Sequence, residues 1–250
     1  MKMSEIIKIR GLNFGYDEEV ILKGVNLDIR NGDFVALVGT NGSGKSTFLK
    51  LLTKQISFQQ GEIKLFGQNI NEFSDWTKLG YISQEVKEFN DSFPATVKEV
   101  IGANLYKEFG RFKLLNLRLD QKINKALELV DMLEHKERQI GNLSGGQQQR
   151  IFIARALVSE PEVIFLDEPL VGVDIENQNK FYQLLNRLNQ DLQLTILIIS
   201  HDVETVIEYA NKVICFSKQK VSSYSIEEFS SEEYLLNSLE ASQVVESSLC

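Results

Sequence analysis

The chain has 250 residues, of which 43% are hydrophobic and 25% are charged, and its formal net charge is −8. This balance excludes a wholly disordered chain and is typical of one large globular domain, or of a core domain with a subdomain. The acidic excess argues against nucleic acid as the main partner, because phosphate backbones are normally bound by a basic surface.

The chain carries only two cysteines and two histidines, too few for a disulfide framework or a histidine-rich metal site. Its N-terminus lacks an apolar core followed by small residues, so we expect no signal peptide. No apolar run reaches the roughly 18–20 residues that a membrane-spanning helix needs. The sequence therefore predicts a cytoplasmic chain that reaches a membrane only through a partner protein.

Short runs rich in β-branched residues predict strands at five places along the chain. These runs are Ile6–Ile9, Phe34–Val38, Val163–Leu166, Thr195–Ile199 and Val213–Phe216. The second, third and fourth are almost continuously apolar, as strands covered on both faces of a parallel sheet are. Their alternation with helical segments predicts an α/β fold, in which ligands bind at the carboxyl ends of the strands.

A glycine-rich segment, here called the phosphate loop, follows the strand 34–38 and precedes the helical run 48–52. Its residues are Gly39, Thr40, Asn41, Gly42, Ser43, Gly44, Lys45, Ser46 and Thr47. Glycines let such a loop curl and aim its backbone N–H groups at phosphate oxygens. We expect Lys45 to reach the β- and γ-phosphates of a nucleotide and Ser46 to ligate Mg²⁺. The alternative, a glycine-rich turn that binds nothing, is disfavoured by the strand–loop–helix context.

The middle of the chain reads as helical. From about residue 89 to residue 157 no buried strand is evident, and apolar residues recur at helical spacing. The recurring residues are Ile123, Ala126, Leu127, Val130 and Leu133. This pattern predicts a helical subdomain inserted into the α/β core. Just before it lies Gln84, whose amide could contact Mg²⁺ or an attacking water, although most glutamines are simply solvated.

A second anion-binding element is predicted at Leu143–Arg150, which opens a helix. Ser144 is a typical N-cap residue, and Gly145 and Gly146 would expose backbone N–H groups at the start of that helix. An ATP molecule has a single γ-phosphate, so two such elements favour a head-to-tail dimer of two copies of the chain. In that dimer each ATP lies between the phosphate loop of one chain and the segment Ser144–Gln147 of the other.

Two carboxylates, Asp167 and Glu168, end the apolar strand Val163–Leu166. We expect Asp167 to bind Mg²⁺ through water and Glu168 to act as the general base on the attacking water. His201 follows another apolar strand and could hold the γ-phosphate or the water, although a lone histidine there is more often structural. The other histidine, His135, lies in a charged run, and we expect it to be solvated at the surface.

The end of the chain differs in composition, because residues 222–250 contain nine serines, six glutamates and no lysine or arginine. We therefore expect a domain over residues 1–221 and an acidic, serine-rich tail over 222–250, which holds most of the net charge. The tail either forms a short amphipathic helix or stays solvated and partly mobile. The apolar residues that would form the helix are Ile226, Phe229, Leu235, Leu236 and Leu239.

Taken in order, the phosphate loop, the segment Leu143–Gln147 and the strand end Val163–Glu168 resemble the ATP-binding subunits of ABC transporters. The resemblance covers roughly residues 6–217. It implies the fold of a P-loop NTPase core of the ABC ATPase type, with the inserted helical subdomain and an N-terminal antiparallel β subdomain. It also implies ATP hydrolysis with ATP and Mg²⁺ bound.

The resemblance further assigns roles residue by residue. Tyr16 matches the aromatic residue that stacks on adenine, and Gln84 matches the lid glutamine. Ser144–Gln147, here called the signature segment, matches the residues that act on the ATP of the other chain. Asp174 matches the loop that links the two sites across the dimer, and His201 matches the switch histidine.

The number of phosphate loops and the spacing of the motifs exclude some branches of the family. The single phosphate loop is unlike the tandem cassettes of ABC translation factors, and the interval from Gln84 to Ser144 leaves no room for the long coiled coils of chromosome-organising relatives. Four segments resemble the importer branch for zinc, manganese or related divalent metals. They are Phe93–Val97, Gln139–Asn142, Val171–Asp174 and Tyr209–Val213.

This resemblance implies an ATPase at the inner face of the cell membrane that powers divalent-metal import. Its expected partners are a second copy of itself, an integral membrane permease and an extracytoplasmic metal-binding protein, with no nucleic acid. Two alternatives stay open: a transporter ATPase for another cargo, and a soluble ABC ATPase outside transport, for example of the iron–sulfur assembly type.

Overall fold

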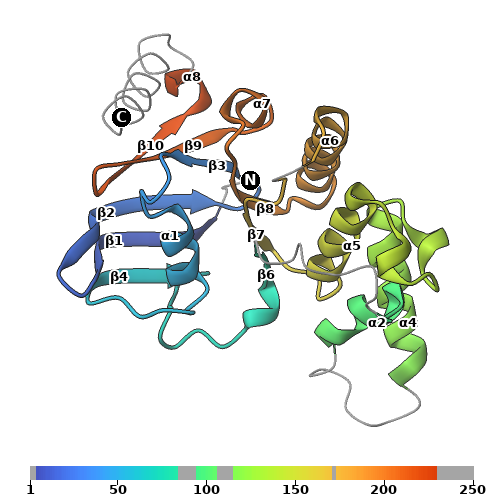
Figure 1. The fold of residues 1–250 in the computed structure, drawn as a ribbon. Helices are drawn as coiled ribbons and strands as arrows, with labels where there is room; N and C mark the ends of the chain where they lie inside the picture. Colours follow the sequence, from blue (N-terminus) through green and yellow to red (C-terminus); the bar gives the residue numbers. More distant parts are fainter. Residues whose placement is uncertain (1–3, 84–93, 106–114, 171–172, 230–250) are drawn as a thin grey trace. The chain divides into compact units, whose positions relative to one another are not determined.

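A computed structural model of the chain describes residues 4–83, 94–105, 115–170 and 173–229 (Figure 1). The chain divides into two compact units, which are described in turn. Unit 1 comprises the described parts of Met1–Ser74 and Leu197–Cys250, and unit 2 comprises those of Asp75–Ile196. In the described part of the chain no helix is both long and apolar enough to cross a membrane.

Unit 1 contains a four-stranded antiparallel sheet in the order β2-β1-β4-β5. The strands are β1 (Glu5–Tyr16), β2 (Glu19–Arg30), β4 (Gln60–Leu65) and β5 (Gln68–Asn69). Ile9 of β1 pairs with Leu27 of β2 on one side and with Ile63 of β4 on the other, and all three are buried. Figure 1 shows β2, β1 and β4 side by side. The expected N-terminal antiparallel β subdomain is therefore confirmed.

Unit 1 also holds a parallel strand pair. In this pair β3 (Phe34–Gly39) runs parallel to β9 (Lys212–Ser217), which in turn pairs antiparallel with β10 (Lys220–Ser225). Asn211 fixes the start of the pair, because its amide oxygen accepts from the Phe34 N–H at 3.1 Å and its own N–H donates to the Phe34 carbonyl at 3.0 Å. Unit 1 also contains the helices α1 (Lys45–Leu52), which begins within the phosphate loop, and α7 (Val203–Ile207).

The first residues of the expected tail are ordered against unit 1. The strand β10 runs across position 221, where the expected domain ends and the expected tail begins. The division into residues 1–221 and 222–250 stays a prediction. A short helix, α8 (Ile226–Phe229), follows, and Phe229 is buried. The Ser225 N–H donates to the Glu228 carboxylate at 2.8 Å at the start of α8. The expected helix is thus present over Ile226–Phe229, while its other apolar residues lie outside the described ranges.

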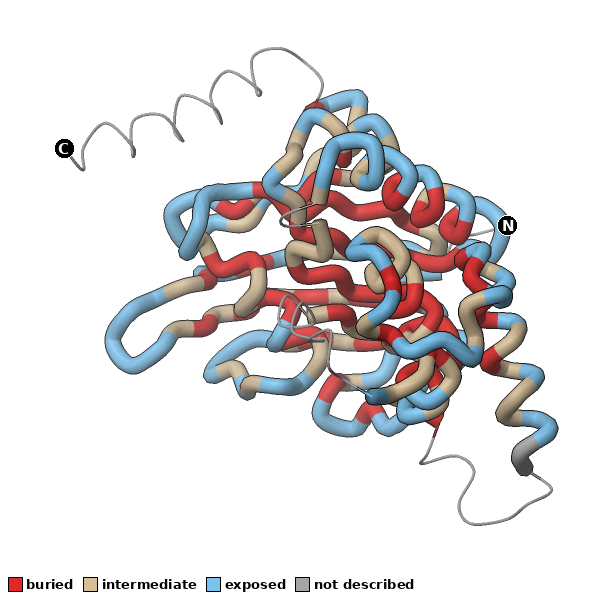
Figure 2. Tube along the Cα trace, turned by 45° about the vertical axis from the view of Figure 1, so that its right-hand side comes forward, coloured by how far each residue is buried: buried red, intermediate tan, exposed pale blue. Residues whose placement is uncertain are grey.

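Unit 2 carries the parallel pair β6 (Leu79–Ile82) and β7 (Val163–Asp167), with Tyr81 opposite Phe165. The next strand, β8 (Thr195–Ile199), begins in unit 2, and the division between the units falls within it. Every residue of β7 and β8 is buried, and Figure 2 shows such buried runs in red. The apolar runs of the sequence therefore do mark strands that are covered on both faces.

The rest of unit 2 is helical, as expected. Its α-helices are α2 (Val97–Gly102), α4 (Leu115–Leu129), α5 (Gly145–Leu157) and α6 (Ile175–Leu192). Its short 3₁₀ turns are η1 (Trp76–Lys78), η3 (Ala103–Leu105), η4 (Leu133–His135) and η5 (Ile140–Asn142). The predicted stripe is buried as far as Val130, but Leu133 is 40% exposed. The prediction is wrong for Leu133, because α4 ends at Leu129 and Asp131 adopts a positive φ of 57°, which breaks the helical spacing.

An ion cluster ties α4 to the segments before and after it. The Asp120 carboxylate lies 2.7 Å from the Lys98 ammonium and 2.7 Å from that of Lys136. The hydrogen bond from Lys136, followed by that from Lys98, holds the pKa of Asp120 below its usual value. Because the carboxylate is partly exposed, solvent screens the attraction and the cluster adds little stability.

We expect Asp120→Asn to lower the free energy of unfolding at pH 7 by less than about 1 kcal/mol. A carboxyl whose pKa is depressed by folding stabilises the fold above its unfolded pKa and loses that contribution as pH falls through the folded value. The difference between the wild-type chain and Asp120→Asn should therefore shrink below about pH 4. Urea unfolding across this pH range measures it, and a difference that does not vary with pH would contradict the assignment.

Candidate nucleotide-binding site

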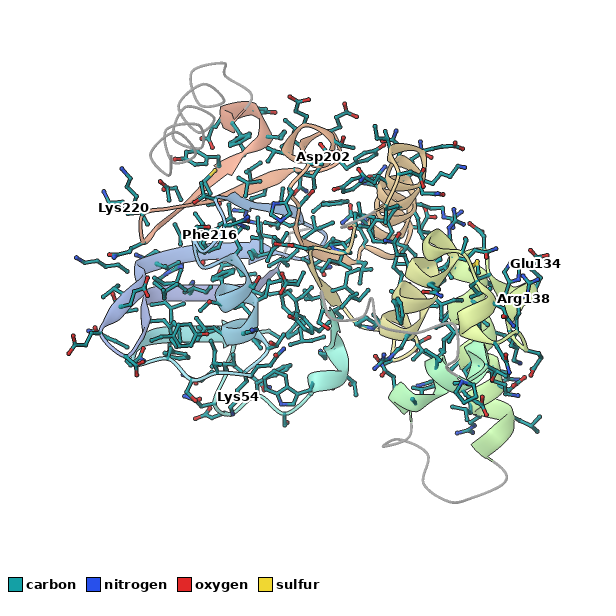
Figure 3. All side chains as sticks on the ribbon, in the orientation of Figure 1. Lys54, Glu134, Arg138, Asp202, Phe216 and Lys220 are labelled. Carbon is teal, nitrogen blue, oxygen red and sulfur yellow. The ribbon has the colours of Figure 1, made fainter. Side chains whose placement is uncertain are left out.

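The phosphate loop lies in unit 1, between the end of β3 and the start of α1. Gly39 has a φ of 146° and Gly44 a φ of 101°, in the region that side chains rarely adopt. A Cβ on Gly39 would come within 2.4 Å of the carbonyl oxygen of Phe216, a residue labelled in Figure 3. A Cβ on Gly44 would come within 2.8 Å of the Ile21 side chain. The tight curl of the loop therefore requires glycine at these two positions.

Lys45 is held inside this curl. Its side chain is only 5% exposed, and its ammonium donates hydrogen bonds to the carbonyl oxygens of Gly39 at 2.8 Å and Thr40 at 2.9 Å. The Ser43 N–H donates to the Thr40 carbonyl at 3.2 Å and closes the turn. A buried cation aimed into a curled loop is suited to an anionic ligand.

The remaining loop residues also fit a phosphate ligand. Asn41 and Gly42 are exposed at the tip, while Ser46 and Thr47 are half-buried in the first turn of α1. Among the described residues no side chain caps this helix at its N-cap Gly44, and its first turn holds no acidic residue. The buried Ser43 hydroxyl finds no hydrogen-bond partner within the described ranges. Uncapped helix N–H groups and a buried hydroxyl can both donate to phosphate oxygens.

Two further expected residues lie in unit 1. Tyr16 ends β1 and is 47% exposed, with its ring edge-on to Phe14 at a centroid distance of 4.9 Å. It is therefore not a core aromatic. His201 is exposed in the turn that follows β8, between Ser200 and Asp202, whose N–H donates to the Ser200 hydroxyl at 3.0 Å. Asp202, labelled in Figure 3, then caps α7.

In unit 2, Asp167 is the last residue of β7 and is only 4% exposed. The Tyr81 hydroxyl donates a hydrogen bond to its carboxylate at 3.3 Å. Sequence analysis missed Tyr81 as a site residue, because only the register of β6 against β7 brings the two side chains together. Mg²⁺ prefers oxygen ligands such as the Asp167 carboxylate and the Ser46 hydroxyl, so these residue types fit that ion.

Glu168 follows Asp167 in the left-handed region, with a φ of 49°. A hydrogen bond fixes the next residue, because the Gln149 amide donates to the Pro169 carbonyl at 2.9 Å. Left-handed backbone costs an ordinary residue about 1 kcal/mol or more, so surrounding contacts must maintain it. The helix α5 therefore supports the backbone that carries Glu168.

The signature segment begins α5 in a reciprocal capping box. The Ser144 hydroxyl accepts from the Gln147 N–H at 3.3 Å, and the Gln147 side-chain oxygen accepts from the Ser144 N–H at 3.0 Å. Ser144 and Gly145 are exposed, and a Cβ on Gly146 would lie 3.3 Å from the Asn177 amide oxygen. The predicted N-cap is confirmed, and the segment presents its N-terminal turn to the surface of unit 2.

A cavity of about 260 Å³ lies beside the signature segment within unit 2. Its lining includes Ser144 and Gln147 together with the basic side chains of Arg150 and Lys180. His135 also lines it. The carboxylates of Asp131 and Glu134 line it as well, so the acidic and basic side chains of the cavity balance.

Asp174 caps α6, the helix that contributes Asn177 and Lys180 to the lining of that cavity. Its carboxylate accepts from the Asn177 N–H at 3.1 Å and from the Asn177 side-chain amide at 2.7 Å, and these hydrogen bonds lower the pKa of Asp174. Asp174 itself is exposed. Gln84, the expected lid residue, and the residues 171–172 before Asp174 lie outside the described ranges.

The sequence matches the protein family described as ABC transporter over residues 22–171. It is 47% identical over 227 residues to the zinc uptake system ATP-binding protein ZurA of Listeria innocua, covering 91% of this chain and 88% of that protein. It is 36% identical to the manganese transport system ATP-binding protein MntB of Listeria monocytogenes, covering 91% of this chain and 93% of that protein.

Among solved structures, the chain is similar to a dimeric ATP-binding cassette in a post-hydrolysis state, bound to ADP and Pi. The TM-score is 0.73 at 26% sequence identity, and the match covers 88% of this chain and 99% of that one. The antiparallel sheet, the α/β strands with the phosphate loop and the helical insert agree with that fold. The chain therefore belongs to the ABC transporter family, as an ATP-binding subunit.

Proposed function

We propose that this chain is the ATPase of a transporter that takes up a divalent metal ion, zinc or manganese. The observation that carries the proposal is its similarity, over 91% of its length, to ATP-binding proteins of zinc and of manganese uptake systems. The curled phosphate loop around the buried Lys45 supports the nucleotide part of the proposal. The cargo itself need not touch this subunit.

For the nucleotide we propose the following roles. Lys45 and the other phosphate-loop residues bind the phosphates, and Tyr16 stacks on the adenine. Ser46, Asp167 and Gln84 would hold Mg²⁺, directly or through water, and the ion would neutralise charge on the β- and γ-phosphate oxygens.

For the hydrolytic step we propose that Glu168 takes a proton from the attacking water. His201 holds the γ-phosphate or that water by a hydrogen bond, and Gln84 helps to orient the water. Glu168 suits this role because it comes directly after the buried strand β7. The backbone next to it is fixed by the hydrogen bond from Gln149 to the Pro169 carbonyl.

For the assembly we propose a head-to-tail dimer of two copies. In it the signature segment of one copy acts on the ATP bound to the phosphate loop of the other, and Asp174 contributes to the link between the sites. The dimeric form of a similar cassette supports this arrangement. The other partners would be a membrane permease and an extracytoplasmic metal-binding protein, with the ATPase held peripherally at the inner face of the membrane.

Gene deletion followed by growth on a metal chelator tests the cargo. Growth should fail and should be restored by added zinc or manganese, and by the wild-type gene but not by a Lys45→Ala copy. If neither metal restored growth, the metal assignment would fail and a transporter for another cargo would be favoured. Cell fractionation completes the test: copurification with a permease is expected, whereas a soluble complex without one would favour an ABC ATPase outside transport.

A further inference from the structure

His135 contacts the signature segment from the neighbouring 3₁₀ turn η4. Its side chain is only 16% exposed, so the expectation that it is solvated is wrong. The ring nitrogen Nε2 lies 3.2 Å from the side-chain nitrogen of Gln147. The charged neighbours that suggested full exposure do point outward, as Glu134 and Arg138 show in Figure 3.

The hydrogen bonds around Gln147 indicate which nitrogen of the neutral His135 ring accepts. A backbone N–H can only donate, so the Gln147 atom that accepts from Ser144 must be its oxygen. The amide end facing His135 is therefore the NH₂ group, which has no lone pair to offer. Nε2 of His135 must then be the acceptor, and the proton of the neutral ring lies on Nδ1.

We propose that neutral His135 is a positioning residue for the signature segment and that its protonation weakens ATP hydrolysis. By accepting from the Gln147 amide, the ring fixes the side chain whose oxygen holds the Ser144 N–H. The capping box in turn orients the Ser144 hydroxyl. The proposal rests on the proposed role of the signature segment in hydrolysis.

Protonation would replace an acceptor by a donor at Nε2. The ring N–H and the amide N–H groups of Gln147 would then face each other, so one of the two side chains must turn away. If the amide turns over, the Ser144 N–H loses its acceptor. If the ring turns away, Gln147 loses its support, and either outcome loosens the start of α5.

Glu134 favours the second outcome, because its carboxylate lies 3.5 Å from Nε2 and would attract a protonated ring. The turn after α4 contributes Asp131 to the same cavity, and the helix α5 contributes Arg150. These two side chains lie 3.7 Å apart, and Asp131 also pairs with Arg187 at 2.8 Å.

From α6, Lys180 faces the cavity and pairs with Glu176 at 2.6 Å. The charges contributed by the turn after α4 and by α5 and α6 are thus already engaged in ion pairs. Glu134 is the carboxylate within reach of the ring nitrogen, so it is the group that competes with Gln147 for a protonated His135.

Steady-state ATPase rates of His135→Gln and His135→Leu test the proposal. The glutamine carbonyl can accept from Gln147 and carries no charge at any pH, whereas leucine cannot accept. At pH 8 we expect the glutamine variant to match the wild type and the leucine variant to lose about fivefold in kcat, the scale of one lost helix cap. The KM for ATP should stay unchanged, because the phosphate loop is intact.

The pH profile separates positioning from simple packing. Between about pH 8 and pH 6, where histidine side chains change charge, the wild-type rate should fall relative to that of His135→Gln. His201 is present in both proteins, so the ratio of the two rates isolates His135. Glu137→Gln, at an exposed position two residues away, is the matched control and should keep the wild-type rate and profile.

Nitrogen-15 spectra of the imidazole rings test the contact without any ATPase assay. The chain has two histidines, so the His135→Gln spectrum assigns both. At pH 8 we expect the His135 ring to be neutral with its proton on Nδ1. A ring protonated on Nε2, or a rate ratio that does not change with pH, would overturn the proposal. An inactive wild-type protein would instead count against the proposed function, while the spectra still report on the contact.

Discussion

The substitution Glu168→Gln is expected to lower ATP turnover by about 10²- to 10⁴-fold, the usual contribution of a general base. Glutamine has the shape of glutamate but cannot take a proton from the attacking water. Because the phosphate loop is unchanged, ATP binding should persist, and the protein should accumulate as an ATP-bound dimer. Single-turnover hydrolysis and size-exclusion chromatography with ATP measure the two effects.

The chain offers a close control for this change in Glu160→Gln. Glu160 is also a glutamate in the left-handed region, with a φ of 54° against 49° for Glu168, but it is exposed and paired with Lys125. Any effect of placing glutamine on such backbone is therefore shared by both variants. Glu160→Gln should hydrolyse ATP at the wild-type rate, and hydrolysis that is undiminished in Glu168→Gln would remove Glu168 from its role.

The substitution Ser144→Arg is expected to lower hydrolysis by at least about 100-fold without weakening ATP binding to the monomer. Arginine cannot accept the Gln147 N–H, so the cap is lost, at a cost of about 1 kcal/mol in stability. Its bulk would also occupy the exposed helix start that we propose acts on the ATP of the second copy. Titration with a fluorescent ATP analogue, alongside hydrolysis rates, separates the two steps.

A second capping box in the same unit serves as the control for Ser144→Arg. Thr96 caps α2 reciprocally with Glu99, in the same way that Ser144 caps α5 with Gln147. Thr96→Arg should show a similar loss of thermal stability and should retain ATPase activity. If Ser144→Arg abolished ATP binding by the monomer, the assignment of the signature segment to the other copy's nucleotide would fail.

Local chemistry explains why the phosphate loop and the cap at Ser144 were predictable from the sequence. Gly39 and Gly44 are required by backbone geometry, and Ser144 by the N–H groups of its own helix, so each signal is contained in a few neighbouring residues. The strands β7 and β8 were predictable for a similar reason, because strands buried on both faces are continuously apolar.

Features set by distant contacts were missed. The strand β2 has a short apolar run, Val20–Leu22, and polar residues such as Lys23 and Asn26 then interrupt the apolar ones, so it shows no long apolar run. Tyr81 reaches Asp167 through strand register, and His135 is covered by packing against α5, neither of which local composition records. The proposed roles of Gln84 and Asp174 stay predictions.

The hydrogen bonds of Lys45 within the phosphate loop bear on the thermodynamics of nucleotide binding. A lysine side chain gives up about 1.5–2 kcal/mol of rotational entropy when it is fixed. In this protein folding has already fixed it, since Lys45 is only 5% exposed and its ammonium is held by two loop carbonyls. An arriving triphosphate therefore meets a preorganised cation, and more of the electrostatic attraction is available as affinity.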